Sequence, residues 1–209
     1  MYPGRTLGRT TVGTDGKDEA EARAVERRAV EAVLAGERAA FRVLVDRHHR
    51  GVYAMIHRFV HNAADADDLA QQAFLSAFDA LGSFDVEQRF STWLYRIAIN
   101  LAKDHLKSKK RTETTLPDGD VRDAAFSGRV APPDEPTGAR ERAALLERAM
   151  AALSIEDREI LVLKDLEELP FEEIKRITGR PVTALKIRAV RARARLRAAL
   201  EKLTPREAL

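Results

Sequence analysis

Residues 169–197 read LPFEEIKRITGRPVTALKIRAVRARARLR, and this stretch decides the architecture of the C-terminal part of the chain. Leu169-Pro170 begins a short helix with an apolar face, and Gly179-Arg180-Pro181 forms a turn. A last helix follows, and its inner face holds Leu185, Ala189, Ala192, Leu196 and Leu200. Two short helices joined by a tight turn that contains glycine predict a helix-turn-helix.

The second of these helices is strongly basic. Residues 180–197 contain six arginines and Lys186, and no acid. A basic helix in this position is typical of proteins that bind duplex DNA. A basic amphipathic helix can also lie on an anionic membrane, but its apolar face then carries bulky anchors, and here that face is mostly Ala and Leu. The composition therefore favours DNA.

Upstream of this motif the chain reads as helix almost throughout. The pattern of apolar residues predicts helices from Asp18 to a stop near Gly36, then over about 37–60, 65–81 and 88–109, and again from about Arg140. Ser154 and Asp157 resemble a capping box, with Ser154 accepting from backbone amides and Asp157 reaching back. No segment alternates as a strand does. We therefore predict an all-α fold.

Residues 112–139 interrupt the helical pattern. They contain four prolines and three glycines, and six acids against two arginines. So long a stretch without periodicity predicts an extended acidic linker between two helical domains. The expected organisation is a disordered leader over 1–17, a first domain over 18–111, the linker over 112–139 and a second domain over 140–209.

The predicted helix over 88–109 carries a row of polar and basic side chains. Steps of three and four residues align these side chains along one side of the helix, as a phosphate backbone requires. The row consists of Thr92, Arg96, Asn100, Lys103, Lys107 and Lys110. Phe84, Phe90, Trp93 and Tyr95 lie in or beside it, and aromatic rings stack on unpaired bases in single-strand binders. For Trp93, a core position and a base contact both remain open.

Composition excludes several classes of protein. The chain has 209 residues, no cysteine, and 36 Lys and Arg against 33 Asp and Glu, for a net charge of +3. Without cysteine there are no disulfides, thiolate zinc sites or thiol catalysts. No apolar run approaches the roughly 20 residues of a membrane span, and the N-terminus does not resemble a signal peptide. We expect a cytoplasmic protein without membrane insertion.

Five stretches resemble one known family. DADDLAQQAFLSAF at 65–78 and FSTWLYRIAINLAKDHL at 90–106 resemble domain 2 of the extracytoplasmic-function sigma factors, within the sigma-70 family. LSIEDREIL at 153–161, together with LPFEEI at 169–174 and RPV at 180–182, resembles their domain 4. The order of these stretches along the chain and the acidic linker between them agree with the family pattern. The resemblance covers about residues 20–203.

The resemblance implies a subunit that directs bacterial RNA polymerase to promoters. Its partners are the β′ and β subunits of the core polymerase, promoter DNA and an anti-sigma factor. The polymerase-binding residues it implies are Asp65, Asp68, Leu69, Gln72, Phe74 and Leu75. For the melted −10 element they are Phe84, Phe90, Trp93, Tyr95, Arg96, Asn100, Lys103, Lys107 and Lys110. For the −35 element they are Arg180, Thr183, Lys186, Ile187, Arg188, Arg191 and Arg195.

The sequence departs from the family pattern at a few positions. Ile187 stands where a small polar residue is usual, and it can pack on a thymine methyl but cannot donate a hydrogen bond. Pro170 replaces the usual serine cap, and Gln72 replaces an acid. Thr183-Ala184 stands where Gly-Thr is common. These changes affect the base code and leave the architecture intact.

Two groups of side chains raise the question of a metal site. His57 and His61 stand four residues apart, a spacing that can bind a metal, but no third ligand is in register. Asp65, Asp67 and Asp68 fan around their helix and do not favour a common ion. We therefore expect no metal, no cofactor and no enzymatic activity. The alternatives are a helix-turn-helix regulator that acts without polymerase and a nucleic-acid-modifying enzyme.

Overall fold

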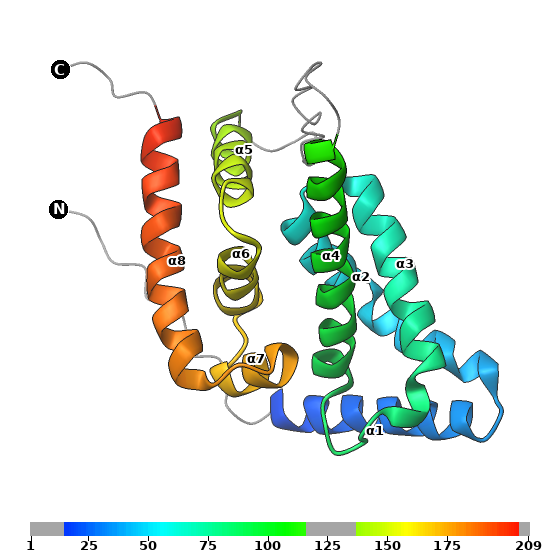
Figure 1. The fold of residues 1–209 in the computed structure, drawn as a ribbon. Coiled ribbons are helices and arrows are strands. Elements are labelled where there is room, and N and C mark those ends of the chain that lie inside the picture. Colours follow the sequence, from blue (N-terminus) through cyan, green and yellow to red (C-terminus); the bar gives the residue numbers. More distant parts are fainter. Residues whose placement is uncertain (1–14, 116–136, 205–209) are drawn as a thin grey trace. The chain divides into compact units, whose positions relative to one another are not determined.

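The computed structural model describes residues 15–115 and 137–204 (Figure 1). Within these ranges the chain forms α-helices and short helical turns and no strand, which confirms the all-α prediction. The chain divides into two compact units, Met1–Asp46 and Arg47–Leu209. The predicted disorder of the leader and most of the predicted linker lie outside the described residues, so the domain boundaries stay predictions.

The first unit contains α1 (Asp15–Leu34), a 3-10 turn (Arg38–Ala40) and the start of α2 (Phe41–Val60). Gly36 follows α1 with φ of +106°, a backbone conformation that favours glycine. The predicted helix stop near Gly36 is therefore confirmed. Helix α1 begins at Asp15, three residues before the predicted start.

In the second unit α2 ends at Val60, and α3 (Ala63–Asp79) begins after Asn62. The Asn62 side chain accepts a hydrogen bond of 2.9 Å from the Asp65 amide, which caps α3. A 3-10 turn (Leu81–Ser83) and a loop lead to α4 (Phe90–Thr115). Helices α3 and α4 lie side by side (Figure 1). The buried side chains of this part include Val52, Met55, Ile56, Phe59, Leu94, Ala98 and Ile99.

The C-terminal part is built from α5 (Thr137–Ala151), α6 (Ile155–Leu161), α7 (Phe171–Thr178) and α8 (Val182–Leu203). A π-helical turn (Val162–Leu166) follows α6. Helix α8 packs on α5, α6 and α7 (Figure 1). Small residues of α8 at this interface permit close approach, and the buried set includes Ile160, Leu163, Ile174, Ile177, Leu185, Ala189 and Ala192.

Two predicted details change. Ser154 accepts from the Asp157 amide at 3.2 Å, as predicted, but the Asp157 carboxylate binds arginines of α8 and does not reach back. Helix α4 continues to Thr115, and α5 begins at Thr137, so both helices enter the predicted linker by a few residues. Lysine and arginine residues favour helix over 107–111, and no proline stops the helix before Pro117.

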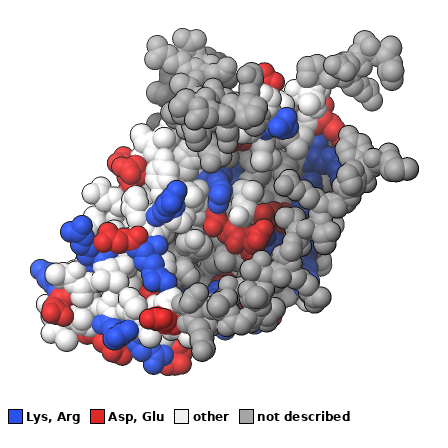
Figure 2. Space-filling model, turned by 180° about the vertical axis from the view of Figure 1, so that it is seen from behind, with Lys and Arg blue, Asp and Glu red and all other residues white. Residues whose placement is uncertain are grey.

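The described helices include none that is both long and apolar enough to cross a membrane. On the face seen in Figure 2, basic and acidic side chains are interleaved wherever the surface is not drawn in grey. A broad field of a single charge does not occur on that visible surface. On this face, electrostatic attraction to nucleic acid therefore has to come from local groups of side chains.

Candidate polymerase and nucleic-acid interfaces

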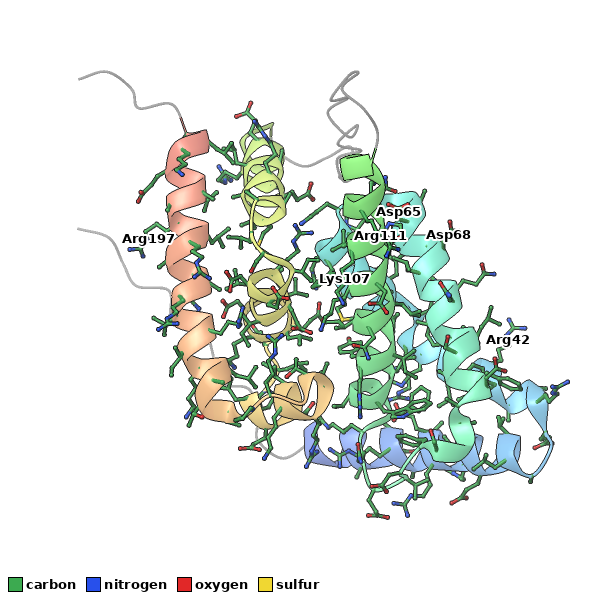
Figure 3. The ribbon with its side chains drawn as sticks, in the orientation of Figure 1. Arg42, Asp65, Asp68, Lys107, Arg111 and Arg197 are labelled. Atoms are coloured by element: carbon green, nitrogen blue, oxygen red, sulfur yellow. The ribbon has the colours of Figure 1, made fainter. Side chains whose placement is uncertain are left out.

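Helix α3 separates the residues predicted to bind polymerase into two sets. Leu69 and Phe74 are buried in the core, whereas Asp68, Gln72 and Leu75 are exposed, with Leu75 63% accessible. Asp65 points toward α4 and Asp68 away from it (Figure 3). The exposed face of α3 is thus largely polar with one large apolar side chain, Leu75, and Leu69 and Phe74 support it from beneath.

Asp65 is held by two residues of α4. Its Oδ2 lies 3.1 Å from His105 Nε2 and 3.6 Å from Lys109 Nζ. Asp65 also sits in the first turn of α3, where the helix dipole favours a negative charge. These contacts fix α3 against α4, and a role of Asp65 in binding polymerase stays a prediction.

Three aromatic rings cluster where the loop meets α4. The Phe84 ring centroid lies 5.4 Å from that of Phe90 and 5.1 Å from that of Trp93, and the Phe90 and Trp93 centroids are 5.6 Å apart. Phe90 is buried, while Phe84 and Trp93 are partly exposed. Trp93 therefore packs against the buried Phe90 and is still partly exposed, so both interpretations of this residue stand.

The predicted polar row of α4 includes exposed side chains and side chains that bind acids of other helices. Arg96, Asn100 and Lys107 are exposed, and Lys107 contacts only its helix neighbour Asp104, at 3.3 Å, among the residues described. Thr92 is buried, and its hydroxyl donates to Glu173 of α7 at 2.9 Å. Lys103 donates to the buried Glu159 of α6 at 3.0 Å. Lys110 lies in α4, and its side chain is outside the description.

Tyr95 is turned toward an acidic partner. Burial, together with the charge and hydrogen bond of Glu167, raises the pKa of the Tyr95 phenol to about 12, while Arg58 acts in the opposite direction. Arg58 also forms an ion pair with Glu167. The hydroxyl of Tyr95 therefore stays protonated at any physiological pH, and its predicted role at DNA remains untested.

The helix-turn-helix is present as predicted. Gly179 ends α7 with φ of +72°, the Arg180 amide bonds to the Thr178 hydroxyl at 3.3 Å, and α8 begins after Pro181. Proline at these starts offers no side-chain cap, so α7 and α8 begin without one. The left-handed conformation at Gly179 lets the chain reverse within three residues.

Several of the basic side chains of α8 are committed to acids within the fold. Arg188 binds Asp157 of α6 at 3.1 Å, and Arg195 binds the second oxygen of the same carboxylate. Arg193 binds Asp165 through two nitrogens, at 2.5 and 2.9 Å. Asp157 is buried. These pairs hold α8 on α6 and on the π-helical turn, and they occupy two of the residues predicted to contact the −35 element.

The opposite side of α8 is open. Ile187 and Val190 are 54% and 65% exposed, and Thr183, Lys186 and Arg191 are exposed around them. Among the residues that the structure describes, Arg191 has no ion pair. This combination of exposed cations and apolar side chains on a helix-turn-helix is suited to the major groove of duplex DNA.

The sequence matches two family models. Residues 44–112 match the model described as Sigma-70 region 2, and residues 143–196 match the model described as Sigma-70, region 4. The RNA polymerase sigma-H factor of Pseudomonas aeruginosa is 38% identical over 182 residues, which cover 83% of this chain and 93% of that protein. This chain belongs to the extracytoplasmic-function sigma factors.

Other proteins similar to this sigma factor are also sigma factors. SigW, an ECF RNA polymerase sigma factor of Bacillus subtilis, is 32% identical, with coverage of 83% of this chain and 96% of that protein. The solved structure of CnrH in complex with the cytosolic domain of CnrY matches with a TM-score of 0.61 and 26% identity, over 87% of this chain and 98% of that one. A Bartonella quintana sigma factor, RpoE, solved with the anti-sigma factor NepR, shares the fold, with a TM-score of 0.59 at 20% identity over 77% of this chain and 96% of that one.

The two histidines considered for a metal site are not aligned in the structure. No group of three His, Cys, Asp or Glu that could hold a metal occurs among the described residues. His61 follows the end of α2 with φ of +57°, so it leaves the helical register that would align it with His57. Both ring nitrogens of His61 are buried without a hydrogen-bond partner in the described part of the chain.

Sequence reasoning missed two residues that organise the sigma factor. Arg158 is buried and donates to three backbone carbonyl groups, and Glu159, also buried, accepts from Lys103 at 3.0 Å and lies 3.6 Å from Arg180. Both lie within LSIEDREIL, where charged residues are normal in an exposed helix. One signal in the sequence could have indicated that these two charged residues are buried: this helix has too few apolar residues to fill its own buried face.

Proposed function

We propose that this sigma factor binds core RNA polymerase through the exposed face of α3 and directs initiation at promoters with −10 and −35 elements. In this proposal, α4 and the aromatic cluster hold the melted −10 strand, and α8 enters the major groove at the −35 element. The polymerase supplies the catalytic chemistry, and we assign no enzymatic role, cofactor or metal to the chain.

One observation carries this proposal furthest. The part of the chain that matches region 2 presents two exposed faces of different chemistry. Asp68, Gln72 and Leu75 on α3 form a polar and apolar face suited to a protein, whereas Arg96 and Asn100 on α4 form a face suited to nucleic acid. A helix-turn-helix regulator that acts alone needs only the second kind of face.

The decisive experiment is reconstitution with core polymerase. The full chain is mixed with core RNA polymerase and a promoter library, and the transcripts are sequenced. We expect initiation at a limited set of sites that share two elements. Binding to duplex DNA without any binding to core polymerase would instead favour a regulator that acts without polymerase.

Three variants assign the faces. Leu75→Arg places a charge on the proposed docking face and should weaken assembly with core polymerase, while Asp67→Asn, exposed on α3 but turned away from that face, should not. Asn100→Ala should lower transcription from duplex promoters more than from templates melted in advance, because pre-melting removes the need to open the −10 element. Equal loss on both templates would remove that role from Asn100.

We also propose control by an anti-sigma factor. The family resemblance implies such a partner, and the Bartonella quintana protein that shares this fold was solved with an anti-sigma factor bound. Capture of the tagged sigma factor from its own cells, followed by identification of bound proteins, tests this. The expected partner abolishes transcription when it is added to the reconstituted holoenzyme.

A further inference from the structure

The exposed centre of α8 is apolar. At about 100° per residue in an α-helix, Thr183, Ile187, Val190 and Ala194 fall within about 60° of one another. Leu185, Ala189 and Ala192 point to the opposite side and are buried. We call the stripe formed by Thr183, Ile187, Val190 and Ala194 the outward stripe, and all four of its side chains are exposed. Its two larger members are Ile187 and Val190.

Cations border the outward stripe on both sides. By the same helical geometry, Lys186 and Arg197 lie on one border and Arg191 on the other. Figure 3 shows Arg197 pointing away from α5 and α6. Neither Arg191 nor Arg197 has an ion pair among the described residues. Arg188 and Arg195 are drawn to Asp157, behind the second border, so they leave the stripe uncovered.

This arrangement fits the major groove better than it fits a protein. A helix in the groove directs its central stripe to the base edges and its borders to the two phosphate strands. Residues 180–197 include no acid, so the segment itself presents no negative charge to a phosphate. The apolar group that base edges offer in the major groove is the 5-methyl of thymine. A purely apolar protein partner would leave the bordering cations without counter-charges.

We propose that Ile187 and Val190 are specificity-determining residues that recognise thymine methyl groups in the −35 element. The inference rests on the proposed function of α8 and adds the chemical feature that it reads. The side chains stand one helical turn apart, so they contact neighbouring base pairs. Neither can donate or accept a hydrogen bond, and discrimination comes from burial of methyl groups.

Deoxyuridine substitution provides the test, because it removes the thymine methyl and preserves base pairing. Holoenzyme made with the full chain is assayed for transcription from its preferred promoter. Each thymine of the −35 element, on either strand, is replaced in turn. For the wild type we expect a loss of about three- to fivefold at one or two positions, the size of one buried methyl group. Ile187→Ala and Val190→Ala should each abolish the response at one of these positions.

Controls separate this inference from the proposed function. Leu146→Ala truncates an exposed leucine of α5 and should keep the wild-type response. Arg191→Ala should weaken transcription from thymine and deoxyuridine promoters by the same factor, since it contacts phosphate. Because Ile187 and Val190 are exposed, their alanine variants should fold normally, which thermal unfolding checks.

Each outcome decides the inference. If Arg191→Ala weakens promoter binding but no deoxyuridine substitution has an effect, α8 contacts DNA and the methyl-reading role is wrong. That role is also wrong if the preferred −35 element contains no thymine, or if both alanine variants keep the full response. Failure of Arg191→Ala to alter binding would instead count against α8 as the DNA-binding helix.

Discussion

At the scale of single residues, Arg158 joins three chain segments. Its guanidinium donates to the Phe59 carbonyl near the end of α2, at 2.7 Å, and to the Met150 and Ala151 carbonyls at the end of α5, at 3.1 and 2.9 Å. The last carbonyls of a helix have no partner within the helix, and a cation there also meets the negative end of the dipole. Burial lowers the pKa of Arg158 to about 10, so it remains charged at neutral pH.

Replacing Arg158 should be costly. Arg158→Met removes a donor from three carbonyl groups, of which that of Met150 still accepts from the Leu153 amide, and we expect the free energy of unfolding to fall by about 2–5 kcal/mol. Urea unfolding followed by circular dichroism measures this. The control is Arg148→Met, which removes an exposed arginine from the last turn of α5, the turn whose carbonyl groups Arg158 binds. This variant should change stability by less than about 0.5 kcal/mol. Equal unfolding midpoints for the two variants would contradict the assignment.

His61 should make the fold sensitive to mild acid. Burial first, then the charges of Arg158 and His57, lower the pKa of His61 to about 4 from 6.5. The unfolded chain therefore binds a proton between pH 6.5 and 4 that the folded chain does not, and stability falls as the pH drops through this window. The full loss, on the order of 3 kcal/mol, is reached near pH 4.

Denaturant unfolding at a series of pH values tests this expectation. His61→Asn removes the titrating group and keeps a residue that tolerates φ of +57°. The wild type should lose more stability than this variant between pH 6.5 and 4.5. A matched variant, His49→Asn, removes an exposed histidine and should keep the wild-type slope. Parallel curves for wild type and His61→Asn would rule out His61 as the source.

At the scale of elements, local signals predicted the helices and failed to predict what their charged faces contact. Gly36, Ser154 and Gly179 mark helix ends through backbone chemistry within a few residues, and each was found where it was predicted. Arg188 was predicted to face DNA because it belongs to a basic helix. Its partner Asp157 lies 31 residues earlier, and no periodicity within either helix encodes that pairing.

Asp157 should therefore be important for the packing of α6 against α8. Asp157→Asn removes the negative charge that Arg188 and Arg195 share, together with one of its two acceptor oxygens, and leaves the residue 157 backbone amide bonded to Ser154. Since both arginines remain partly solvated, we expect a loss of about 1–3 kcal/mol, below that of a fully buried pair. Glu156→Gln removes the same charge one residue away and should change stability little. Thermal unfolding that gives equal midpoints would show that the pairs contribute nothing.

At the scale of the whole molecule, the net charge of +3 conceals partial internal neutralisation. The sequence separates basic blocks at 103–111 and 180–197 from acids between them, and the structure pairs members of these blocks. Glu159 meets Lys103 of the first block and Arg180 of the second. Asp165 meets Arg193. Fewer cations are therefore available to phosphates than the composition alone indicates.

This pairing should appear in the salt dependence of DNA binding. Each phosphate neutralised adds about −0.9 to the slope of log K against log salt concentration. Over residues 182–197 of α8, Lys186, Arg191 and Arg197 have no acidic partner among the described residues, so the full chain on a duplex with the −35 element should show a contribution near −3 from this part of α8. Asp165→Asn releases Arg193 and should steepen the slope by up to about one. Glu168→Gln removes an equal charge nearby without releasing an arginine, and it should raise affinity slightly at an unchanged slope. Identical slopes for the two variants, measured by fluorescence anisotropy from low to moderate salt, would mean that Arg193 reaches no phosphate when released.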